Sequence, residues 1–424
     1  MNRRRVVATF MVLVLLLVVS GCGSNASDSG TSAQDGAQSV KVGVAFPVSG
    51  SLAKIGQAST NGVEIAAEIV NEEQVGPKIE LVKVDVPDAT SAVNEVNRLI
   101  SRQGIKVIVG AYASPISLAI SDVVERNKAI LWEVAATTPI LTERGYKYVF
   151  RPNPNARMYG EGSIDFIYHY LAPKLGVDPK QIKLALVYED GDYGKEITNT
   201  IKQRAKDLGI PIVVDISYNA KTTNDMSSII LQVKQSGADV LAVVQYDADA
   251  QLFWKQAKQM DLNMKAVIGH GAGYSSDNFP QTFGNDIDGI FVVSQAMEIN
   301  KNALSPNAQK LDAEFHKRYK ERFGKEPDLI AKLAFSSSYV LFKEVIPKAG
   351  GTDPDKIREV ALSLDLPKGY VPTGWGVKFD PSGQNTRANV VTMQWQNRKL
   401  VTVYPPEWKV KDPIMIPLPK WSER

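Results

Sequence analysis

The sequence has few of the residues on which most enzymes and disulfide-bonded proteins depend. Its 424 residues include one cysteine, Cys22, and three histidines, His169, His270 and His316. One cysteine excludes an internal disulfide, and the histidines lie far apart with no partner at metal-site spacing. We find no HExxH, no Gly-x-Ser-x-Gly elbow, no P-loop and no Cys–His pair. These absences argue against an enzyme and against a resident metal or cofactor.

The one long apolar run without a charge lies at the N terminus. Arg3, Arg4 and Arg5 precede an apolar segment at 6–19, which ends in Ser20-Gly21-Cys22. This order is typical of an export signal, and we assign residues 1–21 to it. The small pair before Cys22 resembles a bacterial lipobox, which implies cleavage before Cys22 and lipid on its sulfur. The alternative is a plain transmembrane anchor, but the run is short for about 30 Å of hydrocarbon.

A tether follows the leader. Residues 23–39 contain only Gly, Ser, Ala, Thr, Asn, Asp and Gln. Such a segment cannot bury enough apolar surface to offset the entropy of ordering, so we expect residues 22–39 to be a lipidated, flexible linker. Signal, lipid and linker together predict a folded body at the outer face of a membrane.

The body has no excess of either charge. Without the three leader arginines, 46 of the 49 basic side chains remain, against 46 acidic ones. A neutral body argues against nucleic acid as a partner, because phosphate binding needs a basic surface. The mature chain would have about 403 residues, more than one core usually supports, so two domains are expected.

Strand and helix patterns alternate from residue 40 onward. Apolar residues at 40, 42, 44 and 46 fall on one strand face, and those at 63, 66, 67 and 70 repeat at helical spacing. Further strands are expected at 79–85, 106–110, 129–134, 183–188, 212–217, 240–244, 265–269 and 290–293, and helices at 91–102, 116–126, 157–175, 194–208, 226–235 and 251–260. This alternation predicts an α/β protein of two doubly wound lobes, each a parallel sheet covered by helices on both faces.

The alternation breaks at residues 151–155, Arg-Pro-Asn-Pro-Asn, where we expect a crossing between lobes. Long helices at 305–323 and 329–348 would complete the first lobe, and late strands at 377–379, 389–396 and 399–403 would return to the second. The expected division is 40–150 with 295–372 for lobe I, 151–294 with 373–412 for lobe II, and a tail at 413–424. Three crossings of this kind suit a hinge.

Polar residues begin two helices at the carboxyl ends of strands, the region where open parallel sheets bind ligands. Ser114 and Pro115 follow one strand, and Thr137-Thr138-Pro139 follows the next. Ser is favoured at the helix cap and Pro at the first helical position. Free N–H groups and the positive end of the helix dipole would then bind a carboxylate without arginine. The alternative is ordinary helix capping.

Two tyrosines follow strands in the second half of the chain. Tyr193 and Tyr246 would face Ser114 and Thr137 across a cleft between the lobes, although packing on a neighbouring helix is an equal alternative. His270 also follows a strand, where we interpret it as a hydrogen-bonding loop residue and not a catalyst.

The chain resembles the branched-chain amino-acid binding proteins, which are the type I solute-binding components of ABC importers. The opening strand and turn at 40–51 and the segment at 135–146 carry most of the resemblance, together with Tyr193-Gly194, Asp380-Pro-Ser-Gly383 and Gln394-Trp395. It extends from residue 40 to about 406. It implies a small-molecule ligand in the cleft, delivery to a permease and ATPase, and no covalent chemistry; we expect a monomer.

The resemblance assigns roles to individual residues. Ser114 would bind the ligand carboxylate, Ala135 and Thr137 would bind the same head group, and Tyr193 and Tyr246 would close from the second lobe. Phe335 and Ile55 fall where the family often has aromatic residues, and Trp132 would add apolar surface.

The sequence departs from the family at Gly271, where members that hold an α-ammonium commonly have an acidic residue. Asp247 or Glu133 would have to replace it. A branched-chain or related amino acid is therefore the first expectation, with a carboxylate lacking the ammonium, or an amide, as the alternative. Two further alternatives are a sensor of the same solute and a hydrolase that uses Ser114 as nucleophile.

Overall fold

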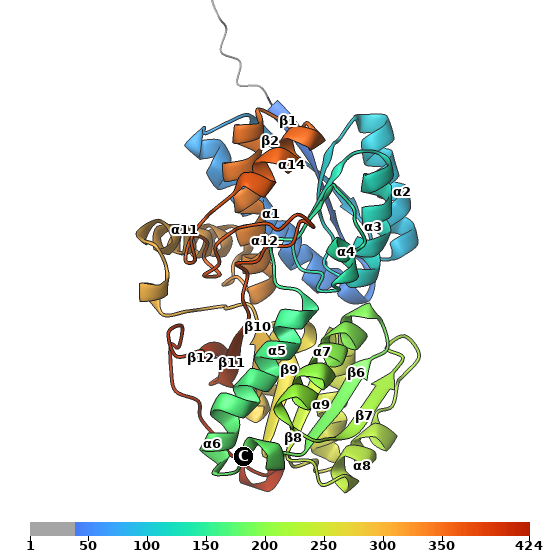
Figure 1. Cartoon of the computed structure of the whole chain (residues 1–424), viewed down its shortest axis with the longest axis vertical. Coiled ribbons are helices and arrows are strands. Elements are labelled where there is room, and N and C mark those ends of the chain that lie inside the picture. Colours follow the sequence, from blue (N-terminus) through green and yellow to red (C-terminus); the bar gives the residue numbers. More distant parts are fainter. Residues whose placement is uncertain (1–38) are drawn as a thin grey trace, which may run out of the picture. The chain divides into compact units, whose positions relative to one another are not determined.

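The computed structural model describes residues 39–424. The export signal, the lipidated Cys22 and the tether were predicted for residues 1–39. Of these, only Ser39 belongs to the described residues. Within 39–424, none of the helices has both the length and the apolar character needed to span a membrane. Two sheets, each covered by helices, form the body (Figure 1).

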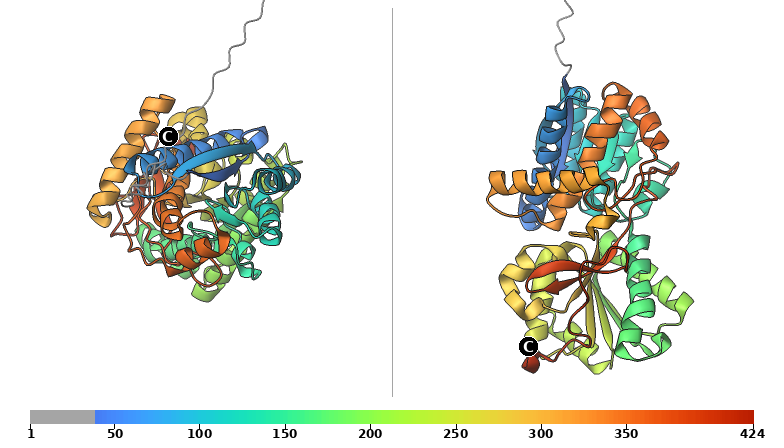
Figure 2. Two further views of the ribbon diagram at one scale, coloured as in Figure 1. Left: turned by 90° about the horizontal axis from the view of Figure 1, so that it is seen from above. Right: turned by 90° about the vertical axis from the view of Figure 1, so that its left-hand side faces the viewer.

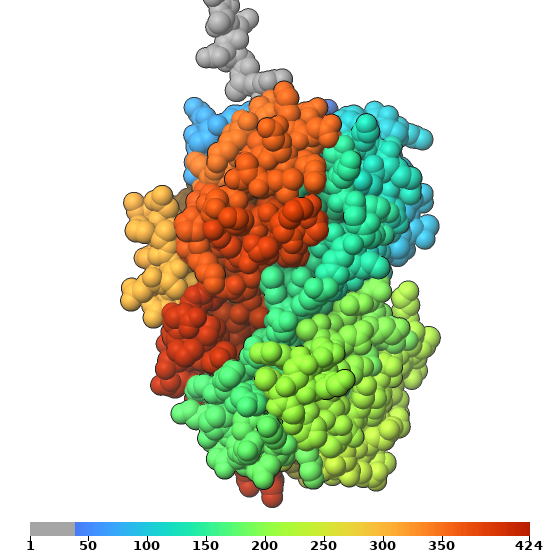
Figure 3. Space-filling model, viewed as in Figure 1, coloured from blue at the N-terminus to red at the C-terminus, as the bar shows by residue number. Residues whose placement is uncertain are grey.

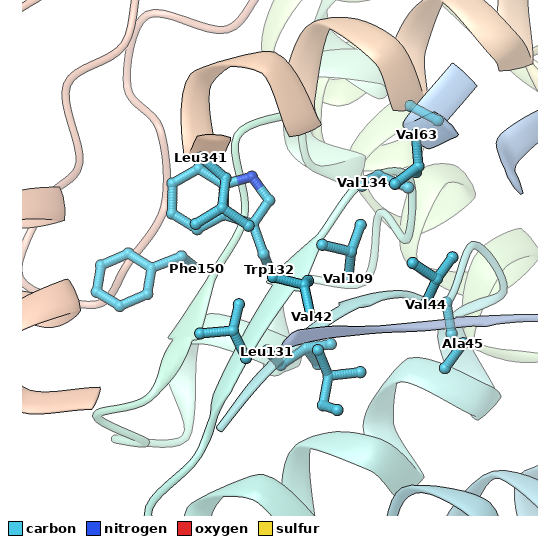
Figure 4. Close-up of a cluster of buried hydrophobic side chains, with 14 of the residues drawn as sticks. Val42, Val44, Ala45, Val63, Val109, Leu131, Trp132, Val134, Phe150 and Leu341 are labelled. Atoms are coloured by element: carbon cyan, nitrogen blue, oxygen red, sulfur yellow. The ribbon is translucent and has the colours of Figure 1, made fainter. Parts of the chain in front are cut away.

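The first lobe is built on a five-stranded sheet in which every strand is parallel, in the order β2-β1-β3-β4-β5. Its strands are β1 Ser39–Phe46, β2 Lys78–Asp85, β3 Val107–Gly110, β4 Ile130–Glu133 and β5 Val149–Phe150. The central strands β3 and β4 are buried along their whole length, as expected for a parallel sheet with two covered faces. Figure 4 shows part of this core, with Trp132 beside Leu341.

Helices from both ends of the chain cover the first sheet. They are α1 Ala53–Glu73, α2 Ala89–Gln103, α3 Ser114–Arg126, α4 Ile140–Glu143, α11 Pro306–Phe323, α12 Leu329–Val340, α13 Ile346–Ala349 and α14 Pro354–Ser363. Among these helices, α1 and α12 make the most extensive contact. A Cβ at Gly62 would lie 2.2 Å from the carbonyl oxygen of Ala331, so glycine is required where these helices cross. This crossing fixes the start of α12, which reaches the ligand cavity described below.

The second lobe has a seven-stranded sheet in the order β12-β11-β10-β9-β8-β6-β7. The strands are β6 Leu184–Glu189, β7 Ile212–Tyr218, β8 Val240–Val244, β9 Ala266–His270, β10 Phe291–Ser294, β11 Val391–Gln396 and β12 Lys399–Tyr404. Its helices are α5 Ala156–Phe166, α6 Ala172–Leu175, α7 Asp192–Leu208, α8 Ser227–Gln235, α9 Asp247–Gln259 and α10 Asn278–Phe283.

Alternate residues of the larger sheet face two separate cores. Leu241 and Val243 pack with α8 and α9, whereas Val240, Ala242 and Val244 pack with α5 and α7. Helices on both sides of the sheet are visible in Figure 2. The predicted two-lobed α/β architecture is therefore confirmed. One detail differs: the sheet is not wholly parallel, because β11 pairs antiparallel with β10. β12 then pairs antiparallel with β11, since a two-residue connection cannot join parallel strands.

The chain crosses between the sheets after β5, after β10 and before β11. Segments from the first and third crossings pair, with an isolated bridge between Arg151 and Gln384. Figure 3 shows the green residues of α5 beside red residues of the C-terminal segment, in agreement with the contact between α5 and β11.

The assignment of residues 377–379 to the second lobe is wrong. Val377 and Phe379 are buried in the core of the first lobe, and the Phe379 ring packs edge-on against Trp132 and Phe150 with centroids 5.4 and 5.2 Å away. Only isolated bridges, not a strand, form there. The chain returns to the second sheet about a dozen residues later, at β11.

Residues 413–424 pack on the second lobe. The Leu418 N–H donates to the carbonyl of Lys265, and Arg424 lies over the rings of Trp421 and Trp254, 4.1 and 5.9 Å from their centroids. Burial lowers the pKa of Arg424 to about 10.

Candidate ligand-binding site

A small cavity lies between the lobes at the carboxyl ends of β3, β4, β8, β9 and β10. Its volume is about 30 Å³, room for a few water molecules. The first lobe contributes Tyr112, Ser114, Ala135, Thr137, Ile330 and Leu333, and the second contributes Tyr159, Tyr193, Tyr246, Gly271, Ala272, Ser294 and Gln295. None of these side chains is acidic or basic. The cavity is therefore neutral, with hydroxyl, phenol and amide groups as its polar side chains.

The N terminus of α3 carries the first polar group. The structure corrects the expected cap: Ala113 is the N-cap, no side chain caps the helix, and Ser114 and Pro115 occupy its first two positions. The Ser114 side chain is therefore not used by the helix. Its Oγ is buried and has no hydrogen-bond partner among the described residues. It lines the cavity next to the N–H groups that the first helical turn leaves unpaired.

Thr137 supplies the second free hydroxyl. Its Oγ1 is also buried without a partner within residues 39–424. The helix expected to start here is a single turn, α4, whose N-cap is Pro139. The dipole argument therefore applies to α3 and not to α4.

Glu133 holds the loop between these two groups. The carboxylate is fully buried and accepts from the N–H groups of Ala111, Ala135 and Ala136 at 2.8 Å, and of Tyr112 at 3.4 Å. Its oxygens are thus bound to main-chain groups of its own lobe and do not face the ligand, so the expectation that Glu133 could pair with an ammonium is wrong. Because the N–H of Ala135 is taken by Glu133, Ala135 can offer a ligand only its carbonyl.

Tyrosines form much of the wall. The Tyr193 hydroxyl donates to the carbonyl of His270 at 2.5 Å, and the Tyr193 and Tyr246 ring centroids are 5.0 Å apart. Both lie in the cavity with Ser114 and Thr137, as the strand-end positions predicted. Burial raises the pKa of Tyr112, Tyr159, Tyr193 and Tyr246, so all four phenols are neutral at physiological pH.

Gly271 lines the cavity, but neither predicted substitute for an acidic residue does. Asp247 accepts from Ser276 Oγ, from Asn278 Nδ2 at 2.5 Å and from Gln251 Nε2 at 3.1 Å. It thus supports the loop at the cleft edge. Gly271 itself has φ +40° and ψ −140°, a conformation that a residue with a side chain rarely adopts.

Three other predicted residues lie outside this cavity. Phe335 is fully buried and stacks on Phe315 with centroids 4.2 Å apart, so it belongs to the core between α11 and α12. Trp132 is also core, and its Nε1 donates to the carbonyl of Ser337 at 2.9 Å. Ile55 lines a second cavity of about 280 Å³, between α1 and residues 276–281.

Several lining residues were missed by the sequence reasoning. Tyr112 follows β3, Ser294 ends β10 and Gln295 follows it, so the strand-end rule applied to every strand would have found them. Tyr112 also has φ +87°, strained for a residue with a side chain and common at functional sites. The helical residues Ile330 and Leu333 carry no comparable signal.

His270 has a structural role. Its ring is fully buried, with Nδ1 2.9 Å from the carbonyl of Val243 and Nε2 2.6 Å from Ser163 Oγ. The carbonyl acceptor requires the proton on Nδ1, so Nε2 accepts from Ser163. Burial lowers the pKa of His270 to about 4. Within residues 39–424, no three His, Cys, Asp or Glu side chains group as metal ligands.

Comparisons with known proteins agree with this architecture. A family model described as periplasmic binding protein matches residues 39–399. Leu/Ile/Val-binding protein homolog 8 of Brucella abortus is 37% identical over 372 residues, which cover 86% of this chain and 90% of the relative. Homolog 7 from the same organism is 34% identical over 369 residues, covering 86% and 91%.

Solved structures share the fold. A leucine-binding protein from Thermotoga maritima is 25% identical, with a TM-score of 0.73 over 86% of this chain and 97% of that one. A branched-chain amino acid transporter substrate-binding protein from Streptococcus pneumoniae, in complex with isoleucine, is 22% identical, with a TM-score of 0.72 over 86% and 98%. These matches confirm the resemblance inferred from the sequence: the chain belongs to the periplasmic binding protein family.

Proposed function

We propose that this protein is an extracytoplasmic solute-binding lipoprotein that delivers a small carboxylate-bearing solute, a branched-chain or related amino acid, to an ABC importer. One observation carries the proposal: Ser114 Oγ and Thr137 Oγ1 are buried, lack partners among the described residues and line the same cavity. Hydroxyls beside a helix N terminus are donors suited to a carboxylate. The names of the Brucella relatives and of the Thermotoga protein support an amino acid as ligand.

Binding and lobe closure are coupled in this proposal. The carboxylate contacts the first lobe at Ser114 and Thr137, and Tyr193 and Tyr246 contact the same ligand from the second. Contacts with both lobes exist only in the closed arrangement, so the ligand stabilises that arrangement. A hydrolase is disfavoured, because no side chain lining the cavity is a base that would activate Ser114.

The test is a thermal-shift screen of amino acids, related carboxylates and small amides, with affinities from calorimetry. A hydrogen bond to a charged group contributes about 1.5–3 kcal/mol, so Ser114→Ala should weaken binding about ten- to a hundredfold. The melting temperature of the empty protein should not fall, because this hydroxyl has no partner to lose. Ser117→Ala is the matched control, because its hydroxyl, one turn along α3, is also buried without a partner within residues 39–424 but does not line the cavity. Equal effects of the two variants would contradict the proposal.

The anchor and the importer are tested in cells. Lipid on Cys22 predicts that Cys22→Ser releases the protein from the membrane fraction. A permease with its ATPase subunits would take up the bound solute, so deletion of the gene should abolish uptake of the labelled solute. A sensor of the same solute would instead leave uptake intact and remove a cellular response. Light scattering should give the mass of a monomer.

A further inference from the structure

The neutral lining of the ligand cavity has a consequence for the ligand itself. Thirteen residues line the cavity, and none has an ionised side chain. Ser114, Thr137 and the N terminus of α3 offer donors to an anion from the first lobe. Gln295 of the second lobe adds its Nε2, which is buried without a partner among the described residues. A helix N terminus acts as about half a positive charge. The cavity therefore offers donors to a monoanion, whereas an ammonium group would find no anionic side chain among the thirteen lining residues.

Nearby carboxylates do not replace the missing partner, since each is bound elsewhere. Glu133 accepts four main-chain N–H groups, and Asp247 accepts three side-chain donors. Glu189 accepts from the N–H groups of Gly191 and Gly194 at 2.6 Å. Asp249 accepts from the Tyr218 hydroxyl, and Asp328 caps α12 through the N–H of Ala331 at 2.8 Å. None of the five lines the cavity.

The backbone conformation of the loop after β9 requires glycine at Gly271, which lines the second-lobe side of the cavity. An ideal Cβ on Gly271 would lie 3.6 Å from Ser294 Oγ and from the Tyr193 hydroxyl, so a side chain there would point among cavity groups without a clash. The positive φ of Gly271, however, disfavours any residue but glycine. The loop as folded therefore excludes an acidic residue at the position from which it would reach an ammonium.

We infer that the cavity recognises the carboxylate and the body of its ligand but not an α-ammonium, so that deaminated monocarboxylates bind at least as tightly as the matching amino acids. A buried ammonium without an anionic partner loses hydration that weaker acceptors only partly replace. This inference rests on the proposed function, because it takes Ser114 and Thr137 as the carboxylate site. It extends the ligand class to small acids with aliphatic or aromatic bodies. The 30 Å³ cavity holds only a few water molecules, so the four tyrosines and Ile330 would contact such a body when the lobes close around it less tightly than in this structure.

Matched ligand pairs test the inference on the wild-type protein. Calorimetry compares leucine with 4-methylpentanoate, and phenylalanine with 3-phenylpropanoate, at pH 7.5. We expect each acid to bind as tightly as its amino acid or more tightly. In a site that pairs the ammonium with a carboxylate, its removal would cost about ten- to a hundredfold in affinity. Tighter binding of both amino acids by more than threefold overturns the inference and leaves the proposed function intact. If no carboxylate of either kind binds, the proposed function fails.

A charge placed in the cavity gives a second, independent readout. Ser294 lines the cavity beside Gly271, and Ser294→Asp would supply the missing carboxylate. In the folded variant the affinity for the amino acid, relative to that for the matching acid, should rise by tenfold or more. Ser294→Asn, of the same size and neutral, should keep the wild-type preference. A folded Ser294→Asp protein with an unchanged preference contradicts the inference. If that variant does not fold, the wild-type ligand pairs still decide.

Discussion

Arg151 donates from its Nε to Oε1 of Gln384 over 2.6 Å, which joins the first crossing between the lobes to the third. The same guanidinium donates from Nη1 to the carbonyl of Thr138 at 2.5 Å and to that of Ala136 at 3.3 Å. Arg151 is fully buried, and burial lowers its pKa to about 10, so it remains charged at neutral pH. One side chain therefore ties the loop around Thr137 to the hinge.

Replacing Arg151 should lower the free energy of unfolding. Arg151→Met leaves the amide oxygen of Gln384 without a donor among the described residues. It also removes the charged donor from the carbonyls of Ala136 and Thr138, which keep only Asn153 Nδ2 at 3.5 Å and the Leu141 N–H at 3.3 Å. Each hydrogen bond to a charged group contributes about 1.5–3 kcal/mol. We expect a loss of at least about 3 kcal/mol in the free energy of unfolding, measured by urea denaturation. Arg157→Met is the control, because Arg157 is exposed and pairs with Glu143 at the surface. That change should cost less than about 1 kcal/mol. Equal losses would refute the role given to Arg151.

Two adjacent threonines provide a test of the carboxylate site. Thr137 and Thr138 both have buried hydroxyls without partners among the described residues, but only Thr137 lines the cavity. Thr137→Val should weaken ligand binding about ten- to a hundredfold through the lost hydrogen bond. Thr138→Val should leave affinity within about twofold. Both variants keep the side-chain shape, so calorimetry on each compares hydroxyls alone. A larger effect at Thr138 would move the binding site to a different part of the loop.

His270 should make the stability of the fold depend on pH in the acidic range. Its pKa is about 4 when folded and about 6.5 in the unfolded chain, so between these values the unfolded state binds the extra proton. The stability associated with this residue is therefore complete above pH 6.5 and is lost as the pH falls to 4. The shift corresponds to about 3 kcal/mol. Urea denaturation between pH 4 and 7.5 should show wild type losing about that much more than His270→Gln. Parallel pH profiles would contradict the account.

The predictable features of this chain are those that local sequence determines. Strand and helix periods predicted the order of the long elements, but missed β5, α10 and α14 and placed a strand at 377–379 where only isolated bridges form. The strand-end rule placed Ser114, Thr137, Tyr193 and Tyr246 in one cavity, although their binding roles remain predictions. Those features depend on residues within one βα unit, where spacing and capping preferences carry the information.

Features that depend on contacts distant in sequence could not be predicted. Phe335 has the composition of a ligand wall, but its stacking partner Phe315 lies twenty residues earlier on another helix, so periodicity does not distinguish core from cavity. Asp247 follows a strand as a ligand-binding acid would, yet Asn278 and Ser276 take its oxygens. Phe379 belongs to the core of the first lobe because its ring packs edge-on against Trp132 and Phe150. Both partners are more than two hundred residues earlier in the sequence, so no local pattern predicts this contact.

Contacts at the cleft edge should set how long the ligand stays bound. Lys54 of α1 donates to Asn278 of α10, and Lys325 pairs with Asp277 at 3.3 Å, so two lysines of the first lobe contact adjacent residues of the second. Opening of the lobes would break both contacts, and they therefore stabilise the closed arrangement alone. Each is exposed, and such contacts contribute about 0.2–1 kcal/mol.

Lys54→Met and Lys325→Met should each speed ligand dissociation up to about fivefold, measured by stopped-flow, with little change in the melting temperature of the empty protein. The double variant should dissociate faster than either single variant. Added salt should speed wild-type dissociation more than that of the double variant, because the Lys325–Asp277 ion pair is screened. Lys41→Met, an exposed lysine on β1 remote from the cleft, is the control. Dissociation rates equal to wild type in the double variant would mean that closure depends on the ligand contacts alone.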